Sequence, residues 1–252
     1  MSLSIWTECG ASSNLRRYQG EAKRVVEAQH ITSTRKLVDS DAEQELLEQL
    51  IDGQKPPIPR NLDSIHYLLY TPFRYPPLRH GSRFGTREQR GIWYGAEQIR
   101  TALAEVSYYR MVFLEGTSAP LKPITVDLTS FEVGLRSERF VDLADSAFAG
   151  YADAISSPSA YERAQQLGSE MREGGVDLFR YRSARDRFGG ANLGMFDAQA
   201  FASTVPTGFR TWRCVASKSV VEMSGKDYLS RVRYRFPRSD FEVDGAVPAP
   251  AP

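Results

Sequence analysis

The segment from Tyr70 to Arg110 constrains the fold most, because turn-forming, extended and helical patterns follow one another there. Three prolines between residues 72 and 77 force extended or turn conformations. Gly91 to Gly95 (GIWYG) predicts a short strand bounded by glycines. Glu97 to Tyr109 then predicts a helix, since its apolar residues recur with helical spacing. Together these patterns predict a turn, a strand and a helix in close succession, at the centre of a mixed fold.

Positive charge is concentrated in the same segment. Its arginines outnumber its acids, which are only Glu88, Glu97 and Glu105, although the formal net charge of the whole chain is +1. The crowded arginines are Arg74, Arg79, Arg83, Arg87, Arg90, Arg100 and Arg110. Because the planar guanidinium group binds phosphate oxygens in pairs, this local excess indicates a site for an anionic small molecule.

Strands and helices are mixed along the rest of the chain. Helices are expected at Ala42–Ile51 and Tyr161–Glu173. Further strands are expected at Ser64–Tyr70, Tyr109–Leu114, Ile124–Leu128, Val176–Tyr181, Phe209–Ala216 and Tyr228–Phe236. This order favours the α+β class over alternating βαβ units.

The chain divides into three parts by composition. Residues 1–60 read as a partly helical N-terminal extension that ends in the proline-rich strap at residues 55–59. Residues 61–240 are expected to form the single mixed domain. Residues 241–252, rich in proline and alanine, are expected to be disordered.

Several classes of protein are excluded by what the sequence lacks. The two cysteines and three histidines do not cluster, so neither a metal site nor a disulfide is expected. There is no apolar run long enough to cross a bilayer and no signal-peptide pattern at the start. We therefore expect a cytoplasmic protein without a membrane partner.

Four residues of the central segment are candidates for a site. Glu105 lies at the edge of the apolar helical stripe, where a carboxylate is half-buried; the alternative is an exposed glutamate paired with Arg100 or Arg110. Arg74 and Arg83 bracket a turn and can converge on one ligand. Tyr94 offers an aromatic face for stacking. The alternatives are weak surface ion pairs for the arginines and a core position for the tyrosine.

Several pieces of the chain resemble the RES domain family, named for an arginine, a glutamate and a serine. These pieces are Ser82–Gly85 (SRFG), Gly91–Glu97 (GIWYGAE), Thr101–Val106 (TALAEV), and Leu178–Arg185 followed by Gly190–Leu193. The resemblance covers roughly residues 65 to 215, and the block from Tyr94 to Glu105 is its most specific part.

The resemblance implies a toxin of a bacterial toxin-antitoxin pair, with an ADP-ribosyltransferase-like core that cleaves the nicotinamide-ribose bond of NAD. Arg83, Glu105 and Ser183 match the three family residues, Tyr94 matches the associated aromatic, and Arg74 matches a second arginine loosely. NAD is then a substrate bound by Arg74, Arg83, Tyr94 and Ser183, with no separate cofactor. The implied partner is an antitoxin with a helix-turn-helix domain. The chain departs from the family pattern where Arg182-Ser183 replaces Pro-Ser.

Such chemistry suits these residue types. Breaking the glycosidic bond develops positive charge on the ribose, which a fixed carboxylate such as Glu105 stabilises more in the transition state than in the ground state. The acceptor of ADP-ribose stays open between water, phosphate and a protein. Ser183 lacks the context of a nucleophile, since no G-x-S-x-G pattern surrounds it.

A second kind of function starts from a different segment. Arg231, Arg233 and Arg235 alternate with apolar residues near Tyr234 and Phe236, and arginines beside aromatics can bind nucleic acid. The near-neutral total charge argues against this alternative.

Overall fold

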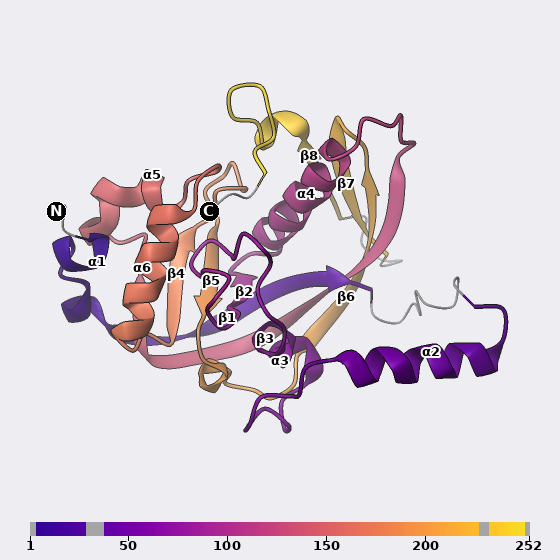
Figure 1. Ribbon diagram of the computed structural model, residues 1–252. Coiled ribbons are helices and arrows are strands. Elements are labelled where there is room, and N and C mark those ends of the chain that lie inside the picture. Colours follow the sequence, from indigo (N-terminus) through magenta and orange to yellow (C-terminus); the bar gives the residue numbers. More distant parts are fainter. Residues whose placement is uncertain (1–3, 29–37, 227–231, 250–252) are drawn as a thin grey trace.

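Strand pairing organises the protein around one curved sheet. The computed structural model describes residues 4–28, 38–226 and 232–249 (Figure 1). These residues form an eight-stranded sheet in the order β1-β2-β5-β4-β3-β6-β7-β8, and β1 also pairs with β3. The strands are β1 Arg16–Glu27, β2 Trp93–Ala96, β3 Ile124–Asp142, β4 Leu178–Arg182, β5 Ala191–Met195, β6 Thr207–Ala216, β7 Val220–Gly225 and β8 Arg233–Pro237.

The double pairing of β1 closes a circuit of five strands. β1 runs antiparallel to β3 from Arg16 to Glu27, and its Lys23 pairs with Ala96 of β2. β2 continues to β5, β5 to β4, and β4 returns in parallel to the end of β3. β6, β7 and β8 extend the sheet from the other edge of β3. Every pairing in the sheet is antiparallel apart from the one between β3 and β4.

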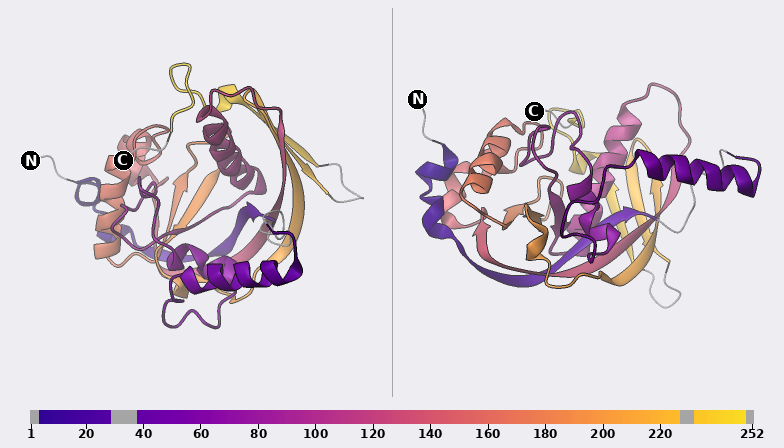
Figure 2. Two further views of the ribbon diagram at one scale, coloured as in Figure 1. Left: turned by 45° about the vertical axis from the view of Figure 1, so that its right-hand side comes forward. Right: turned by 60° about the horizontal axis from the view of Figure 1, so that its bottom comes forward.

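Helices cover this sheet in different places. α4 (Ile99–Glu115) lies within the curve made by β3 and β6 to β8, whereas α6 (Glu162–Glu173) lies beside β4 with α1 (Ile5–Glu8) next to it (Figures 1 and 2). α3 (Tyr67–Arg74) and α5 (Ala152–Ile155) are short. α2 (Asp41–Gln54) projects away from the rest of the fold. This mixed arrangement confirms the predicted α+β class.

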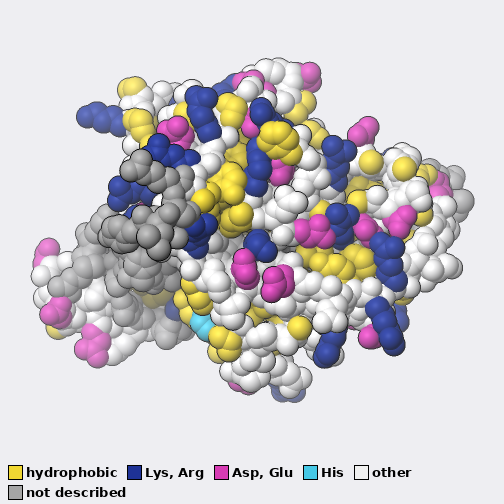
Figure 3. Space-filling model, turned by 180° about the vertical axis from the view of Figure 1, so that it is seen from behind, with side chains coloured by type: hydrophobic (Ala, Val, Ile, Leu, Met, Phe, Trp, Pro, Cys, Tyr) yellow, Lys and Arg dark blue, Asp and Glu magenta, His cyan; other side chains and the backbone are white. Residues whose placement is uncertain are grey.

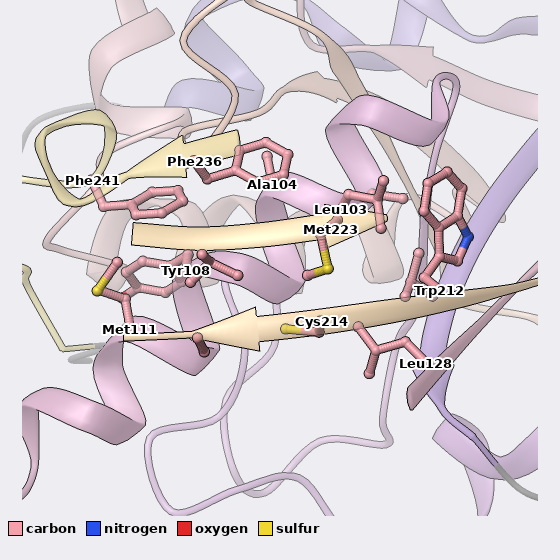
Figure 4. Close-up of a cluster of buried hydrophobic side chains, with 14 of the residues drawn as sticks. Leu103, Ala104, Tyr108, Met111, Leu128, Trp212, Cys214, Met223, Phe236 and Phe241 are labelled. Carbon is pink, nitrogen blue, oxygen red and sulfur yellow. The ribbon is translucent and has the colours of Figure 1, made fainter. Parts of the chain in front are cut away.

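One buried cluster fixes α4 against the sheet. The helix contributes apolar side chains at helical spacing, and the strands contribute alternate residues of their inner face. Figure 4 shows Leu103, Ala104, Tyr108 and Met111 of α4 packed with Leu128, Trp212, Cys214, Met223, Phe236 and Phe241. Most of these side chains are fully buried. The position of α4, and of any functional residue on it, is therefore set by the core.

A second cluster lies between α6 and β4. Phe84 is fully buried, and its ring centroid lies 4.7 Å from that of Phe179 and 4.8 Å from that of Tyr181, with the rings edge to face. Leu167 and Met171 of α6 belong to the same cluster. Phe84 therefore anchors the turn that carries the neighbouring Arg83.

Several predicted elements are confirmed. The strand at residues 91–95 corresponds to β2, and the helix at residues 97–109 lies largely within α4. The helices at residues 42–51 and 161–173 correspond to α2 and α6. The expected strands that begin at residues 124, 176 and 209 overlap β3, β4 and β6. The last expected strand overlaps β8 at its end, whereas residues 227–231 lie outside the described part of the chain.

Two predicted strands are wrong, because helical packing overrides their aromatic and β-branched composition. Residues 64–70 lead into α3, where His66 Nδ1 accepts a hydrogen bond from the backbone N–H of Leu68. Residues 109–114 continue α4, since Met111 and Leu114 are buried one and two turns beyond Tyr108. In both places local propensity differs little between helix and strand, and packing against the rest of the fold favours the helix.

The ends of the chain also differ from expectation. The core was expected to begin after the strap at residues 55–59, yet β1 lies in the sheet, with Ala22 and Val25 buried. Within the expected disordered tail, Phe241 and Val247 are buried in the cluster around α4. Tyr108 Oη also donates to the carbonyl of Pro248 at 2.6 Å. Residues 241–249 therefore pack on the core, and residues 250–252 lie outside the described part.

Candidate active site

A pocket of about 310 Å³ opens between β1, β2, α4 and the turn before β2. Elements far apart in the chain meet there because the five-strand circuit brings β1, β2, β4 and β5 together. The lining residues are Lys23, Arg24, Val25, Ser82, Arg83, Tyr94, Gly95, Ala96, Ala102, Glu105, Val106, Tyr109, Tyr161, Tyr181 and Asn192. The pocket thus combines a few charged groups with four tyrosines.

Glu105 presents a held carboxylate at this pocket. Its Oε1 accepts hydrogen bonds from Ser183 Oγ at 2.7 Å and from Asn192 Nδ2 at 2.5 Å. The alternative of an ion pair with Arg100 or Arg110 is not what the structure shows. Arg100 pairs with Asp186, and Arg110 pairs with Glu27. Two neutral donors therefore hold Glu105, and no cation of the described residues forms an ion pair with it.

Ser183 directly follows the last residue of β4. It contacts Glu105 but does not itself line the pocket. Its hydroxyl oxygen accepts the backbone N–H groups of Arg185 and Asp186, both at 3.0 Å, and it donates to Glu105. Ser183 is buried and is not among the lining residues. This geometry suits a residue that orients the carboxylate, and direct contact with a substrate stays a prediction.

Tyr94 uses its hydroxyl within the protein. The Tyr94 Oη lies 3.0 Å from Ser82 Oγ and accepts the backbone N–H of Phe84 at 3.3 Å. Burial of the phenol raises the pKa of Tyr94 to about 12, so the hydroxyl stays protonated at neutral pH. The ring lines the pocket, whereas the hydroxyl holds the turn that carries Arg83.

Arg83 lies on that turn and enters the pocket. Its Nη1 donates to the backbone carbonyl of Ser157 at 2.6 Å, and its guanidinium stands 4.7 Å from the ring centroid of Tyr161. Arg83 is also buried, at 8% exposed. The structure therefore brings Arg83, Tyr94 and Glu105 together, with Ser183 in contact with Glu105.

Arg74 does not join this group. It ends α3, where its Nε donates to the backbone carbonyl of Pro56 at 2.6 Å and its guanidinium lies 5.8 Å from the Tyr75 ring centroid. Arg74 does not line the pocket. The prolines around Arg74 predict a turn that directs Arg74 and Arg83 toward one ligand. That prediction is wrong, because residues 67–74 form a helix with Pro72 inside it.

Arg24 is a pocket residue that the sequence analysis missed. Its Nη1 donates to the backbone carbonyl of Tyr94 at 2.8 Å, and its guanidinium stands 5.5 Å from the Trp93 ring centroid. Burial lowers its pKa to about 10, which leaves it charged at neutral pH. No carboxylate of the described residues forms an ion pair with it, whereas the neighbouring Lys23 lies 3.5 Å from Glu132. Nothing in the spacing of β1 links this arginine to a site formed some 60 residues later.

The arginines of β8 are less suited to binding a ligand than Arg24 and Arg83 of the pocket. Arg233 and Arg235 are exposed, and Arg235 Nε lies 3.9 Å from Glu222 Oε1 on β7. Arg231 lies outside the described residues. On the face that Figure 3 shows, basic and acidic side chains are interspersed. The described part of this surface gives no specific support to nucleic-acid binding.

No group of three or more His, Cys, Asp or Glu side chains among the described residues is placed to hold a metal ion. In the same part of the chain, no helix is long and apolar enough to span a membrane.

Fold and site together define an α+β protein with a small tyrosine-lined pocket, in which arginines flank one carboxylate. The family model of the RES domain matches residues 58–217, more than half of the chain. The chain belongs to the RES domain family. Arg83, Tyr94, Glu105 and Ser183 lie inside the matched segment, whereas Arg24 lies before it. No curated protein matches the chain significantly.

Proposed function

We propose that this protein is an NAD-degrading toxin that cleaves the nicotinamide-ribose bond and passes ADP-ribose to water or phosphate. The observation that carries the proposal is the Glu105 carboxylate. Two neutral donors hold it at a pocket that Arg24 and Arg83 also line. Membership of the RES domain family supports the same substrate class.

Glu105 is the proposed catalytic residue. As the glycosidic bond breaks, positive charge develops on the ribose, and a preorganised carboxylate stabilises that charge without having to reorient. Ser183 and Asn192 supply the preorganisation, because both donate to the same oxygen of Glu105. The second oxygen, Oε2, remains for the ribose.

The two arginines are proposed to bind the pyrophosphate. Arg83 and Arg24 lie in the same pocket, and a guanidinium bound to a phosphate oxygen forms a strong charge-assisted hydrogen bond. Of the tyrosines that line the pocket, Tyr109 is the most exposed, and its ring and that of Tyr94 are the candidates for stacking on the nicotinamide. The pocket volume is at the lower end for small-molecule sites, so the adenosine end of NAD is expected to extend out of it.

A toxin of this kind requires a partner that restrains it. We propose an antitoxin with a helix-turn-helix domain, as in the family. The pocket residue Tyr109 and the next residue along that face of α4, Phe113, are 48% and 65% exposed. An apolar strip beside the pocket mouth is a suitable surface for a partner that blocks access.

The test is to incubate purified, antitoxin-free protein with NAD and to follow nicotinamide and the ADP-ribosyl product. Free ADP-ribose, or its phosphorylated form when phosphate is present, supports the proposal. If label from NAD appears only on protein after addition of cell lysate, the enzyme is instead a protein ADP-ribosyltransferase. No release of nicotinamide under any of these conditions contradicts the proposal.

A further inference from the structure

We propose that Gln165 of α6 is a positioning residue that holds Arg83 in the pocket. The inference rests on the proposed function, since it assigns Arg83 to binding of the anionic part of the substrate. Gln165 does not line the pocket and lies outside every motif that the sequence analysis singled out. Its side chain instead reaches the backbone of the turn from Ser82 to Gly85.

The contacts of Gln165 are directed at that turn. Its Nε2 lies 3.0 Å from the carbonyl oxygen of His80, 3.0 Å from that of Ser82 and 3.5 Å from that of Gly85. Gln165 is 7% exposed, and Arg83, Phe84 and Gly85 of the turn are buried as well. One buried amide nitrogen thus binds the chain on both sides of Arg83.

The turn is held from its other side by β2. Tyr94 Oη accepts the N–H of Phe84 and contacts Ser82 Oγ. Within the turn, the N–H of Ser82 donates to the carbonyl of Gly85 at 2.7 Å. The backbone of Arg83 therefore lies between Gln165 of α6 and Tyr94 of β2, and these contacts aim its side chain.

The chemistry of glutamine explains the choice of residue. An amide nitrogen carries two N–H donors, which match the carbonyls of His80 and Ser82. Leucine has a similar size but no donor. Gln165→Leu would leave the carbonyl of His80 without this donor and the carbonyl of Ser82 with only the backbone N–H of Gly85 at 3.3 Å, and that loss is costly enough for the turn to shift. A displaced turn moves Arg83 away from the phosphate position while Glu105, held by other elements, stays in place.

The test separates substrate binding from catalysis. Gln165→Leu is expected to raise the KM for NAD about tenfold and to leave kcat within about twofold, as expected for loss of binding made equally in ground and transition states. Gln166→Leu is the matched control. Gln166 is exposed on the same helix and contacts only Glu170 in the described structure, so neither parameter should change.

A double-mutant cycle shows whether the effect passes through Arg83. If it does, adding Gln165→Leu to Arg83→Ala raises KM no further, because the interaction that Gln165 supports is already absent. Full additivity of the two effects on KM would overturn the proposal. So would a fall in kcat with KM unchanged, which marks general damage to the fold.

Amide hydrogen exchange tests the same contacts without any substrate. Exchange in residues 80–86 is expected to rise at least tenfold in Gln165→Leu and to stay unchanged in Gln166→Leu. Unchanged exchange in Gln165→Leu contradicts the inference even if the wild type cleaves NAD. Absence of NAD cleavage by the wild type contradicts the proposed function instead, and hydrogen exchange still decides on the turn. If Gln165→Leu does not fold, Gln165→Asn, which keeps the amide but shortens its reach, takes its place.

Discussion

A carboxylate held by neutral donors keeps its full negative charge for a ligand, whereas one in an ion pair is already neutralised. Glu105 is of the first kind, since Ser183 and Asn192 bind it. The cations near it are arranged for the ligand as well. The guanidinium of Arg24 donates to a backbone carbonyl and faces an aromatic ring, and no carboxylate of the described residues forms an ion pair with it. Separate charges of opposite sign in one pocket suit a substrate that has both a cationic ring and a pyrophosphate.

Arg24 is expected to contribute directly to binding of the anionic part of the substrate. Arg24→Ala is expected to weaken NAD binding about tenfold to hundredfold, because a hydrogen bond to a charged group contributes about 1.5–3 kcal/mol. The measurement is the Kd for ADP-ribose by calorimetry. Arg17→Ala on the same strand is the control, since Arg17 is exposed and only pairs with Glu138. Equal affinity of wild type and Arg24→Ala would remove Arg24 from the site.

Tyr94 gives a prediction for alkaline pH. Its pKa is about 12 in the folded state, above the ordinary value of 10, because the phenol is buried. The contribution to stability is therefore complete below pH 10 and is lost as the pH rises from 10 to 12, at about 1.4 kcal/mol per pH unit. Urea unfolding of wild type between pH 8 and pH 11 should show this loss. Tyr94→Phe should lose less over the same range, and an identical loss in both proteins would disprove the assignment.

The sequence patterns predict which residues of the segment from Tyr70 to Arg110 are functional candidates better than they predict what those residues contact. Arg83, Tyr94 and Glu105 lie close together in the chain and in the pocket. Arg74, also close in the chain, is turned away because α3 directs it to Pro56. Spacing along a chain restricts local geometry only, so a side chain from a distant strand, such as Arg24, gives no sign in the sequence that it will arrive.

At the scale of elements, α6 must approach the Arg83 turn closely. Gly168 of α6 lies where an added Cβ would stand 1.9 Å from the carbonyl oxygen of Phe84. Any side chain there pushes the helix away from the turn, and the buried contacts of Phe84 depend on that proximity. The pocket therefore depends on a helix none of whose own residues lines it; only Tyr161, just before the helix begins, does so.

Two glycine substitutions test this close approach. Gly168→Ala is expected to reduce the free energy of unfolding by about 1–3 kcal/mol and to raise KM, because the clash displaces the turn. Gly53→Ala in α2 is the control: an added Cβ meets nothing within 4 Å there. It should stabilise by up to about 1 kcal/mol, as alanine usually does in a helix. Denaturant unfolding measures both, and a stabilised Gly168→Ala would contradict the proposed packing.

The accuracy of the element predictions followed the strength of the local pattern. The helix at residues 97–109 repeats its apolar residues regularly, and α4 confirms it. The last two turns of α4 are predicted as a strand, because Tyr109 to Leu114 is rich in residues with high strand propensity. β1 was missed because it is mostly polar, with Ala22 and Val25 as its buried residues. Its place in the sheet comes from pairing with β2 and β3, which no local pattern records.

At the scale of the whole molecule, β1 completes both the sheet and the pocket. It pairs with β2 and β3 and lines the pocket with Lys23, Arg24 and Val25. The family match begins only at residue 58, after this strand. In this chain, the segment outside the matched region therefore supplies part of the site.

A truncated chain that begins at residue 58 tests that dependence. Without β1 the long strand β3 loses one of its two antiparallel partners and exposes Phe131, Val133 and Leu135. We expect the truncated protein to be insoluble or to lack a cooperative thermal transition, measured by circular dichroism. A stable, cooperatively folded fragment that cleaves NAD at the wild-type rate would show that β1 is dispensable.

If the carboxylate of Glu105 stabilises the transition state of NAD cleavage, Glu105→Gln must slow that cleavage. The substitution keeps the shape of the side chain but removes the charge that stabilises the transition state. Nicotinamide release from NAD should fall at least 100-fold in kcat, with the Kd for ADP-ribose changed less than threefold. Undiminished nicotinamide release by Glu105→Gln, at the wild-type kcat, would exclude Glu105 as the catalytic carboxylate.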